Sequence, residues 1–201
     1  MSDSTTPFGQ AKYQVRFDWG AVGAERIVPG AHVVVLVDAL SFTTTVVVAA
    51  ERSDETPVGE ASVVVDAVLA AGGHPLVLAA SLRNRTAVAE RVLAHQEERG
   101  ERMIVAIVAV GDADRLPIED QLTAGAVVDA LVGVGIDHTS PEAAVASAAF
   151  ESLRRAVVHL IGASGSGVEL TAVGRAAEVR LATQLDATRV VPELHDGAFR
   201  A

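Results

Sequence analysis

The sequence contains no cysteine and no hydrophobic run long enough to cross a bilayer. The absence of cysteine excludes disulfides, thiol catalysis and metal sites with cysteine ligands. The first fourteen residues, MSDSTTPFGQAKYQ, are polar and lack the apolar core of a signal peptide. We therefore expect a soluble, cytoplasmic protein with no membrane partner.

Basic and aromatic residues are also scarce. The 16 Lys and Arg residues stand against 26 Asp and Glu, which gives a formal net charge of −10 at pH 7. Because binding to nucleic acid needs clustered positive charge, this balance argues against a nucleic-acid partner, although a local site could still hold a small phosphorylated ligand. Aromatic residues make up 3% of a chain that is 50% hydrophobic, so Val, Ala and Leu must build the core. Such small apolar side chains favour closely packed layers of helix and sheet.

Apolar runs of strand length alternate with segments of helical period, which is the pattern of βα units. It predicts an α/β fold with three α/β/α layers around a largely parallel or mixed sheet, in which a short strand over residues 188–194 could lie antiparallel at an edge. We expect one domain over residues 1–201, with a flexible N-terminus over residues 1–12. The predicted strands occupy residues 13–17, 32–38, 74–80 and 103–110. The predicted helices occupy residues 42–52, 61–73, 86–100, 118–135, 140–161 and 168–186, and the last of them is broken near Gly174.

The strand predicted at residues 32–38 ends in Asp38, and Thr43, Thr44 and Thr45 then begin a helix. Ligands of open α/β sheets bind beyond the carboxyl ends of the strands, and the start of a helix favours an anion. A carboxylate beside an anion site is repulsive unless a divalent cation lies between them, and Mg²⁺ prefers oxygen ligands. One hypothesis is that Asp38 holds Mg²⁺ and the threonines hold a phosphate. The alternative is that Asp38 caps the turn and the threonines only pack the helix start.

Two further strand ends carry polar side chains. Arg83, Asn84 and Arg85 follow the strand at residues 74–80, and arginine can bind phosphate with two hydrogen bonds. Glu119 and Asp120 begin the helix that follows the strand at residues 103–110. If the three strand ends converge, they form a metal-assisted phosphate site. The alternative is that each strand end is simply followed by an ordinary polar loop, which would explain any one of the three taken alone.

Other motifs are weaker. Residues 162–167, GASGSG, could cradle an anion or act as a flexible connector, but no Gly-Lys-Ser/Thr follows as in a P-loop. The six histidines show no ligand spacing, and no Gly-x-Ser-x-Gly segment is present, which argues against an α/β-hydrolase.

Four segments, in order from Val33 to the C-terminus, resemble the 2-phosphosulfolactate phosphatases, magnesium-dependent enzymes of coenzyme M biosynthesis. VVVLVDALSFTTTVVVAA resembles that family's DVLRATTT segment, and SLRNRTAVAE resembles its GSLRNAxAVA segment. IEDQLTAGAVVDAL is similar to its xEDxLxAGAV helix. The C-terminal block from ASGSGVEL to the end is similar to the family's last block, in which a Ser-Gly-x-Glu-Leu run precedes an acid-rich helix and a final Val-Pro strand.

The resemblance implies a cytoplasmic α/β/α phosphatase that uses Mg²⁺ to hydrolyse a small, doubly anionic phosphorylated carboxylic acid. It points to Asp38, Thr43, Thr44, Thr45, Asn84, Glu119 and Asp120. In this reading Asp38 coordinates the metal with Glu119 or Asp120, while Thr43–Thr45, Asn84 and one of Arg83 or Arg85 hold phosphate oxygens. Attack on phosphorus could come from water or from a carboxylate such as Asp38.

Two departures from the family pattern leave alternatives open. Ser41 stands where the family's first segment has arginine, and the family's Gly-Asn-Ser-Pro and Asn-Gly-Thr/Ser segments are absent before residue 81. The middle of the chain therefore looks shortened. The alternatives are a catalytically impaired relative that binds a small anionic ligand, and an interaction protein that forms a homo-oligomer through its Val/Ala-rich faces.

Overall fold

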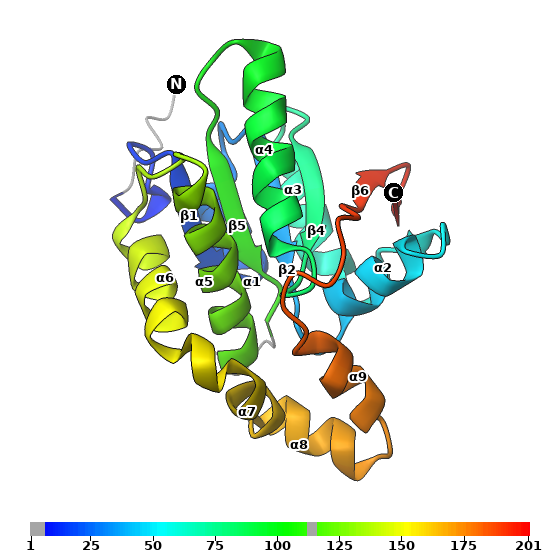
Figure 1. Ribbon diagram of the computed structural model, residues 1–201. Coiled ribbons are helices and arrows are strands. Elements are labelled where there is room, and N and C mark those ends of the chain that lie inside the picture. The colour runs from blue at the N-terminus through cyan, green and yellow to red at the C-terminus, as the bar shows by residue number, and fades with distance from the viewer. Residues whose placement is uncertain (1–6, 112–115) are drawn as a thin grey trace.

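The computed structural model describes residues 7–111 and 116–201, apart from the side chain of Glu60. A mixed seven-stranded sheet with the order β1-β5-β2-β4-β6-β7-β3 runs through this part of the chain (Figure 1). β1, β5, β2 and β4 are parallel, and β6, β7 and β3 continue the sheet with antiparallel pairing. The strands are β1 (Val15–Trp19), β2 (Val33–Val37), β3 (Thr56–Pro57), β4 (Leu76–Ala80), β5 (Val105–Ala109), β6 (Glu193–His195) and β7 (Ala198–Arg200).

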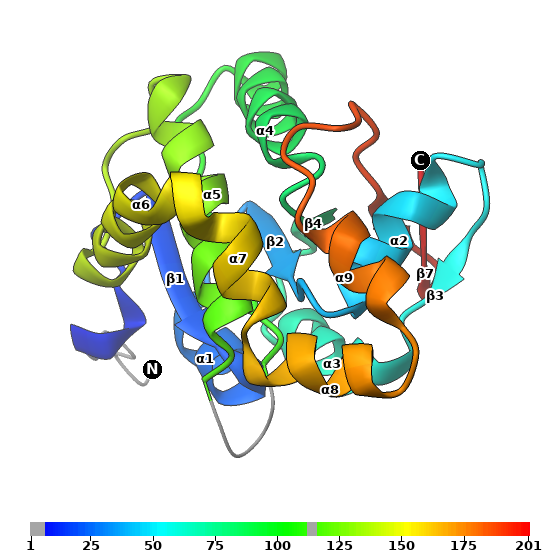
Figure 2. The ribbon, with the colours of Figure 1, turned by 60° about the horizontal axis from the view of Figure 1, so that its bottom comes forward.

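Helices cover both faces of the sheet, which confirms the predicted three-layer α/β fold (Figure 2). α4, α5 and α6 pack on one face, and α1 and α3 pack on the other. The helices within the described residues are α1 (Gly20–Ile27), α2 (Phe42–Ala50), α3 (Ser62–Ala70), α4 (Arg85–Arg99), α5 (Ile118–Gly133), α6 (Pro141–Leu153), α7 (Val157–Gly162), α8 (Gly165–Ala172) and α9 (Ala176–Ala182).

The unbroken apolar run of β2 follows from its central place in the sheet. Val33, Val35 and Val37 belong to the core beneath α4, α5 and α6. Val34 and Leu36 belong to the opposite core beneath α1 and α3. Because successive side chains of a strand point to opposite faces, a strand covered on both sides needs apolar residues at every position.

Several elements differ from the sequence-based expectation. α1 was not expected, because its sequence GAVGAERI is short and contains two glycines. The helix expected over residues 140–161 is interrupted by a 3-10 turn at Arg154–Ala156 between α6 and α7. Residues 162–167 are no flexible connector, since the Ser164 hydroxyl accepts a hydrogen bond of 3.1 Å from the Gly167 N–H and caps α8.

Both ends of the described chain differ from the sequence-based expectation. Residues 1–6 of the expected flexible N-terminus lie outside the described residues, but Pro7–Gly9 forms a 3-10 turn. The buried Gln10 side chain exchanges hydrogen bonds of 2.8 and 3.0 Å with the backbone of Phe17. At the other end, β6 pairs antiparallel with β4 but is not an edge strand, because β7 and β3 extend the sheet beyond it.

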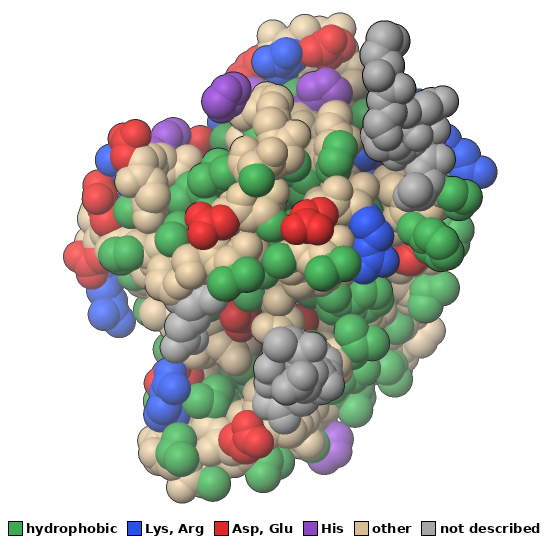
Figure 3. Space-filling view, turned by 180° about the vertical axis from the view of Figure 1, so that it is seen from behind, with side chains coloured by type: hydrophobic (Ala, Val, Ile, Leu, Met, Phe, Trp, Pro, Cys, Tyr) green, Lys and Arg blue, Asp and Glu red, His purple; other side chains and the backbone are tan. Residues whose placement is uncertain are grey.

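The outer face of the molecule carries both apolar and acidic side chains. Figure 3 shows hydrophobic side chains distributed between acidic ones on the side opposite to α4 and α5. α1 and α3 cover that side of the sheet, and their residues Val22, Val63 and Leu69 are exposed. The homo-oligomer stays a prediction, because nothing in the structure shows what covers these residues. No helix in the described ranges combines the length and apolar character needed to span a membrane.

We expect Gly125→Ala to destabilise the fold strongly, because α5 and α6 touch at this residue. A Cβ atom on Gly125 would lie 2.1 Å from the Ala146 carbonyl oxygen, which is backbone and cannot move aside alone. Overpacking of this kind typically costs roughly 1–3 kcal/mol of unfolding free energy, or more. Denaturant titration measures the loss. Gly133→Ala is the matched control on the same helix, since nothing lies within 4 Å of its added Cβ. Equal stability of the two variants would contradict the prediction.

Candidate active site

The carboxyl ends of β2, β4 and β5 meet at one edge of the sheet, because the three strands are parallel neighbours. α7, α8 and α9 run across this edge (Figures 1 and 2). A third apolar cluster, containing Leu82, Leu122 and Phe150, joins the strand ends to Val157 and Ile161 of α7. The fold therefore places residues that follow different strands beneath one helical cover.

Asp38 and Thr43 build the turn between β2 and α2. The Thr43 hydroxyl accepts a hydrogen bond of 2.8 Å from the Asp38 N–H and donates one of 2.7 Å to the Asp38 carbonyl. The Asp38 carboxylate oxygen Oδ1 accepts a hydrogen bond of 3.2 Å from the Phe42 N–H at the first turn of α2. These contacts hold the half-buried Asp38 carboxylate at the helix start, where the dipole favours negative charge.

The two following threonines also bond to the backbone. The Thr44 hydroxyl donates to the Ala39 carbonyl at 2.9 Å, and the Thr45 hydroxyl donates to the Ser41 carbonyl at 2.8 Å. Thr43 and Thr44 are buried, whereas Thr45 is exposed. A bound phosphate would have to displace these hydrogen bonds to use the hydroxyl protons. The contacts favour a packing role for Thr43 and Thr44, and Thr45 is the most accessible of the three.

Asp120 lies against the end of β2, although 81 residues separate it from Ala39. Its carboxylate oxygen Oδ1 accepts a hydrogen bond of 2.7 Å from the buried Ala39 N–H. Burial raises the pKa of Asp120 well above its ordinary value, and the negative charges of Asp38 and Glu119 raise it further, while N–H groups of Ala39 and Gly111 act in the opposite direction. The structure thus brings Asp38 and Asp120 close enough for their charges to repel.

Glu119 completes this acidic group from the first turn of α5, where it is also buried. Within the described residues, no three His, Asp or Glu side chains are arranged to hold a metal by themselves. Mg²⁺ usually takes one or two carboxylates and completes its coordination with water and substrate phosphate. A pair of repelling carboxylates with hard oxygen atoms is a donor set that fits Mg²⁺ in this way.

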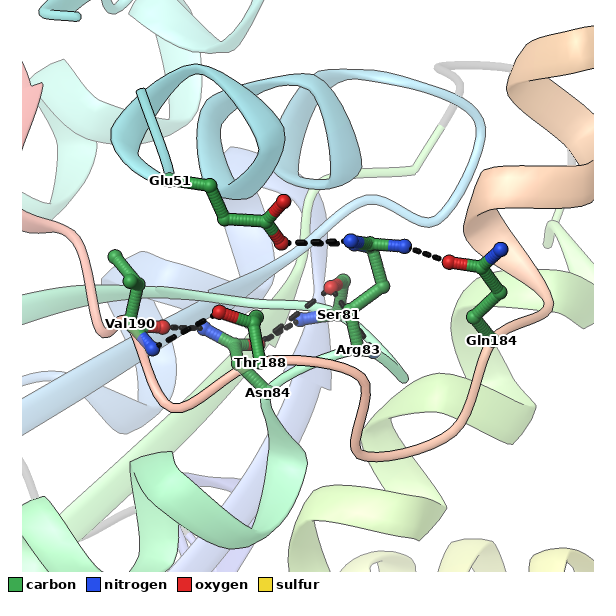
Figure 4. Close-up of polar contacts among 7 residues, drawn as sticks. All are labelled: Glu51, Ser81, Arg83, Asn84, Gln184, Thr188 and Val190. Atoms are coloured by element: carbon green, nitrogen blue, oxygen red, sulfur yellow. Dashed lines mark hydrogen bonds and ion pairs between the residues drawn. The ribbon is translucent and has the colours of Figure 1, made fainter. Parts of the chain in front are cut away.

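Arg83 and Asn84 form the turn after β4, and both are committed to intramolecular contacts (Figure 4). The Asn84 amide donates to the carbonyls of Ala79 and Val190 at 3.2 and 3.0 Å, and its oxygen accepts from the Ser81 N–H at 2.9 Å. Because Asn84 is fully buried and satisfied, its contacts favour a structural role.

The Arg83 guanidinium joins two other parts of the chain to this turn. Its Nη2 atom lies 2.7 Å from a carboxylate oxygen of Glu51, which follows α2, and its Nη1 atom donates to Gln184, which follows α9 (Figure 4). Arg83 therefore fixes the C-terminal segment against α2. A phosphate would have to compete with Glu51 for this guanidinium.

Arg85 is also held by intramolecular contacts, with a different set of partners. Its guanidinium contacts the carboxylates of Asp129 at 2.9 Å and Asp186 at 3.1 Å, and lies 5.2 Å from the ring centre of Phe150. The arginine side chain is 7% exposed. These contacts also favour a structural role, and the phosphate-binding roles predicted for Arg83 and Arg85 stay predictions.

One residue near this site was not singled out by the sequence. Arg175, between α8 and α9, places its Nη2 atom 3.3 Å from the hydroxyl oxygen of Ser41 at the start of α2. The two residues are 134 positions apart, and no local pattern connects them. Only the return of the C-terminal helices across the sheet edge brings them together.

Comparison with known proteins confirms the family resemblance. The family model for 2-phosphosulpholactate phosphatase matches residues 64–197. The probable 2-phosphosulfolactate phosphatase of Synechococcus sp. (strain WH7803) is 33% identical over 128 residues, which cover 63% of this chain and 50% of that protein. The protein of the same name from Thermosynechococcus vestitus (strain NIES-2133 / IAM M-273 / BP-1) is 34% identical over 127 residues, which cover 59% and 48%. The chain spans about half the length of the curated relatives it matches.

The matched region has a consequence for the site. It includes the turn at residues 83–85 and the Glu119–Asp120 pair, and it begins after Asp38 and Thr43–Thr45. The contact between Asp120 and Ala39 therefore connects the matched region to the strand end that lies outside it.

Proposed function

Because this chain belongs to the 2-phosphosulfolactate phosphatase family, we propose that it is a magnesium-dependent phosphatase of small phosphorylated carboxylic acids in the cytoplasm. The observation that carries the proposal is the buried Asp120 carboxylate beside the strand end that bears Asp38. Two carboxylates that repel each other at a ligand-binding sheet edge are favourably placed around a divalent cation. The substrate class follows from the names of the relatives.

In this proposal Asp38 and Asp120 hold Mg²⁺, and Glu119 supports them from the same helix turn. When bound, Mg²⁺ would offset the charge on the phosphoryl oxygens and favour attack on phosphorus. The hydrogen bonds from Phe42 N–H to Asp38 and from Ala39 N–H to Asp120 fix one oxygen of each carboxylate.

Hydrolysis of the ester needs one new bond from phosphorus to oxygen and the loss of the bond to the alkyl oxygen. The new bond comes from water directly, or from Asp38 followed by water. The leaving alkyl oxygen takes up a proton. Thr45, the exposed hydroxyl at the start of α2, is the most accessible of the predicted phosphate ligands, whereas Asn84 and Arg85 act mainly by shaping the strand ends.

Phosphate release from a panel of phosphorylated carboxylic acids, including 2-phosphosulfolactate, tests the proposal. We expect release that depends on Mg²⁺ and stops on chelation. Folded protein that releases no phosphate from any acid in the panel would overturn the proposed activity.

A second candidate is a relative that binds a small anionic ligand without turnover. The internal pairing of Arg83, Asn84 and Arg85, together with the absence of the family's arginine at Ser41, favours it. Calorimetric binding of a phosphorylated acid without phosphate release would identify this function.

A further inference from the structure

Ser41 is the first residue before α2, a position at which serine usually caps the helix with its side chain. Within the described part of the chain, its side chain makes no such capping hydrogen bond. Its hydroxyl instead lies 3.3 Å from Arg175 Nη2. A guanidinium from the turn between α8 and α9 therefore reaches the start of α2.

Arg175 is held there by Glu178 of α9. Two arginine nitrogens lie 2.7 and 2.6 Å from the two carboxylate oxygens, which is the parallel two-bond geometry that guanidinium also forms with phosphate, carboxylate or sulfonate. The hydrogen bond from Arg175 lowers the pKa of Glu178, so this carboxylate is charged at neutral pH. Glu178 therefore occupies Arg175 as a substrate oxyanion would.

Solvent and a ligand can reach this ion pair. The Arg175 and Glu178 side chains are 50% and 32% exposed, and exposed pairs contribute little to folding stability because water and salt screen them. Asp38, three residues before Ser41, places the proposed metal-binding carboxylate at the same helix start. Asp38 and Arg175 therefore both contact residues at the start of α2.

We infer that Arg175 binds an oxyanion of the substrate at the start of α2, with Glu178 as its competitor in the unliganded protein. The inference deepens the proposed function and rests on it. Arg175 acts here as a binding and specificity residue, and it approaches from the α8–α9 turn.

Four variants test this inference through KM and kcat for the preferred phosphorylated acid. Loss of one charge-assisted contact should raise KM of Arg175→Gln about 10-fold or more, with a smaller change in kcat. Arg175→Lys should recover part of the loss, because it keeps the charge without the paired geometry. Glu178→Gln should lower KM a few-fold, because it removes the competing carboxylate. Arg180→Gln, an exposed arginine on the same helix, should match the parent.

The opposite behaviour of the Arg175 and Glu178 variants distinguishes binding from a latch between α2 and α9. If Glu178→Gln raises KM as much as Arg175→Gln, the pair only holds the helices together and the inference is wrong. Unchanged KM in Arg175→Gln, with a parent that turns over, would also overturn it without affecting the proposed function.

If the parent releases no phosphate, the proposed activity is wrong, but the role of Arg175 in binding can still be tested. Calorimetric titration then measures binding directly. The probes are 2-phosphosulfolactate, sulfolactate and inorganic phosphate. Weaker binding to Arg175→Gln than to the parent supports the inference, and the probe that loses affinity identifies the oxyanion that Arg175 holds. A parent that binds none of the three, or a variant that binds them equally well, would overturn it.

Discussion

Asp38→Asn should abolish magnesium-dependent phosphate release and leave the fold intact. Asparagine keeps the size of the side chain, and its Oδ1 atom can still accept the hydrogen bond from Phe42 N–H that shapes the start of α2. It loses the negative charge that a divalent cation requires. Removal of one preorganised charged group in an active site commonly costs roughly 100- to 1,000-fold in rate. We therefore expect kcat to fall by at least this factor, while the melting temperature changes little.

The matched control for Asp38 is Asp66→Asn, on the exposed side of α3 and away from the sheet edge. Both variants lose one negative charge, so the comparison removes the general effect of net charge on substrate attraction. If Asp38→Asn turned over substrate like the parent, Asp38 would only be a turn residue. The alternative interpretation, in which Asp38 caps the turn and the threonines only pack the helix start, would then be correct.

The sequence contained enough information to place these carboxylates at strand ends, but not to show which of them meet. The run at Val33–Val37 is apolar at every position, so a central strand and a polar residue beyond it could be predicted. The contact between Ala39 and Asp120 depends on β2 lying beside β5. The order of strands in a sheet is a long-range property that hydrophobic periodicity does not encode.

The roles of the arginines were harder to foresee, because their partners come from distant segments. Arg83 and Arg85 follow a strand at the carboxyl edge of the sheet, where ligands of open α/β folds commonly bind, which suggests phosphate binding. Their guanidiniums contact Gln184 and Asp186, about a hundred residues later in the chain. Arg175 could not be identified from the sequence, because it lies between two helices, far from any predicted strand end.

The break between α6 and α7 shows a limit of helical periodicity. The segment around Arg154 and Arg155 contains no glycine or proline, and a continuous helix was expected there. The structure turns at this point and buries Val157 and Ile161 against Leu82 at the carboxyl edge of the sheet. Tertiary burial therefore overrides the local preference and brings the C-terminal helices over the site.

Asp120→Asn should stabilise the metal-free protein at neutral pH and remove its magnesium-dependent activity. The raised pKa of Asp120 reflects a cost of holding its charge among buried groups and beside Asp38 and Glu119. Asparagine carries no charge and can still accept the hydrogen bond from Ala39 N–H. We expect the unfolding free energy at neutral pH to rise, by about 1.4 kcal/mol for each pH unit over which the folded protein holds the Asp120 proton more tightly than the unfolded chain. Denaturant titration in the presence of a chelator measures the change.

The pH dependence of stability gives an independent measure of the same carboxyl. The unfolded chain releases the Asp120 proton near its ordinary pKa of about 4, whereas the folded protein retains it to a higher pH. Between these two pKa values the folded state binds more protons, so the contribution of Asp120 to stability falls as the pH rises. Asp120→Asn should lack this fall, and the difference in stability between variant and parent should grow with pH across the window. An identical pH dependence in both proteins would assign the effect to another group.

Mg²⁺ should reverse this cost in the parent, because its binding requires the charged carboxylate that burial disfavours. A ligand that binds only the folded state raises stability according to its concentration and affinity. At pH values above the pKa of Asp120, we expect Mg²⁺ to raise the melting temperature of the parent. At lower pH, protons compete for the carboxylate and Mg²⁺ binds more weakly. Asp120→Asn should show little or no rise. If Mg²⁺ stabilised both proteins equally, Asp120 would not be a ligand, and the buried repulsion at this sheet edge would have a cause unrelated to metal.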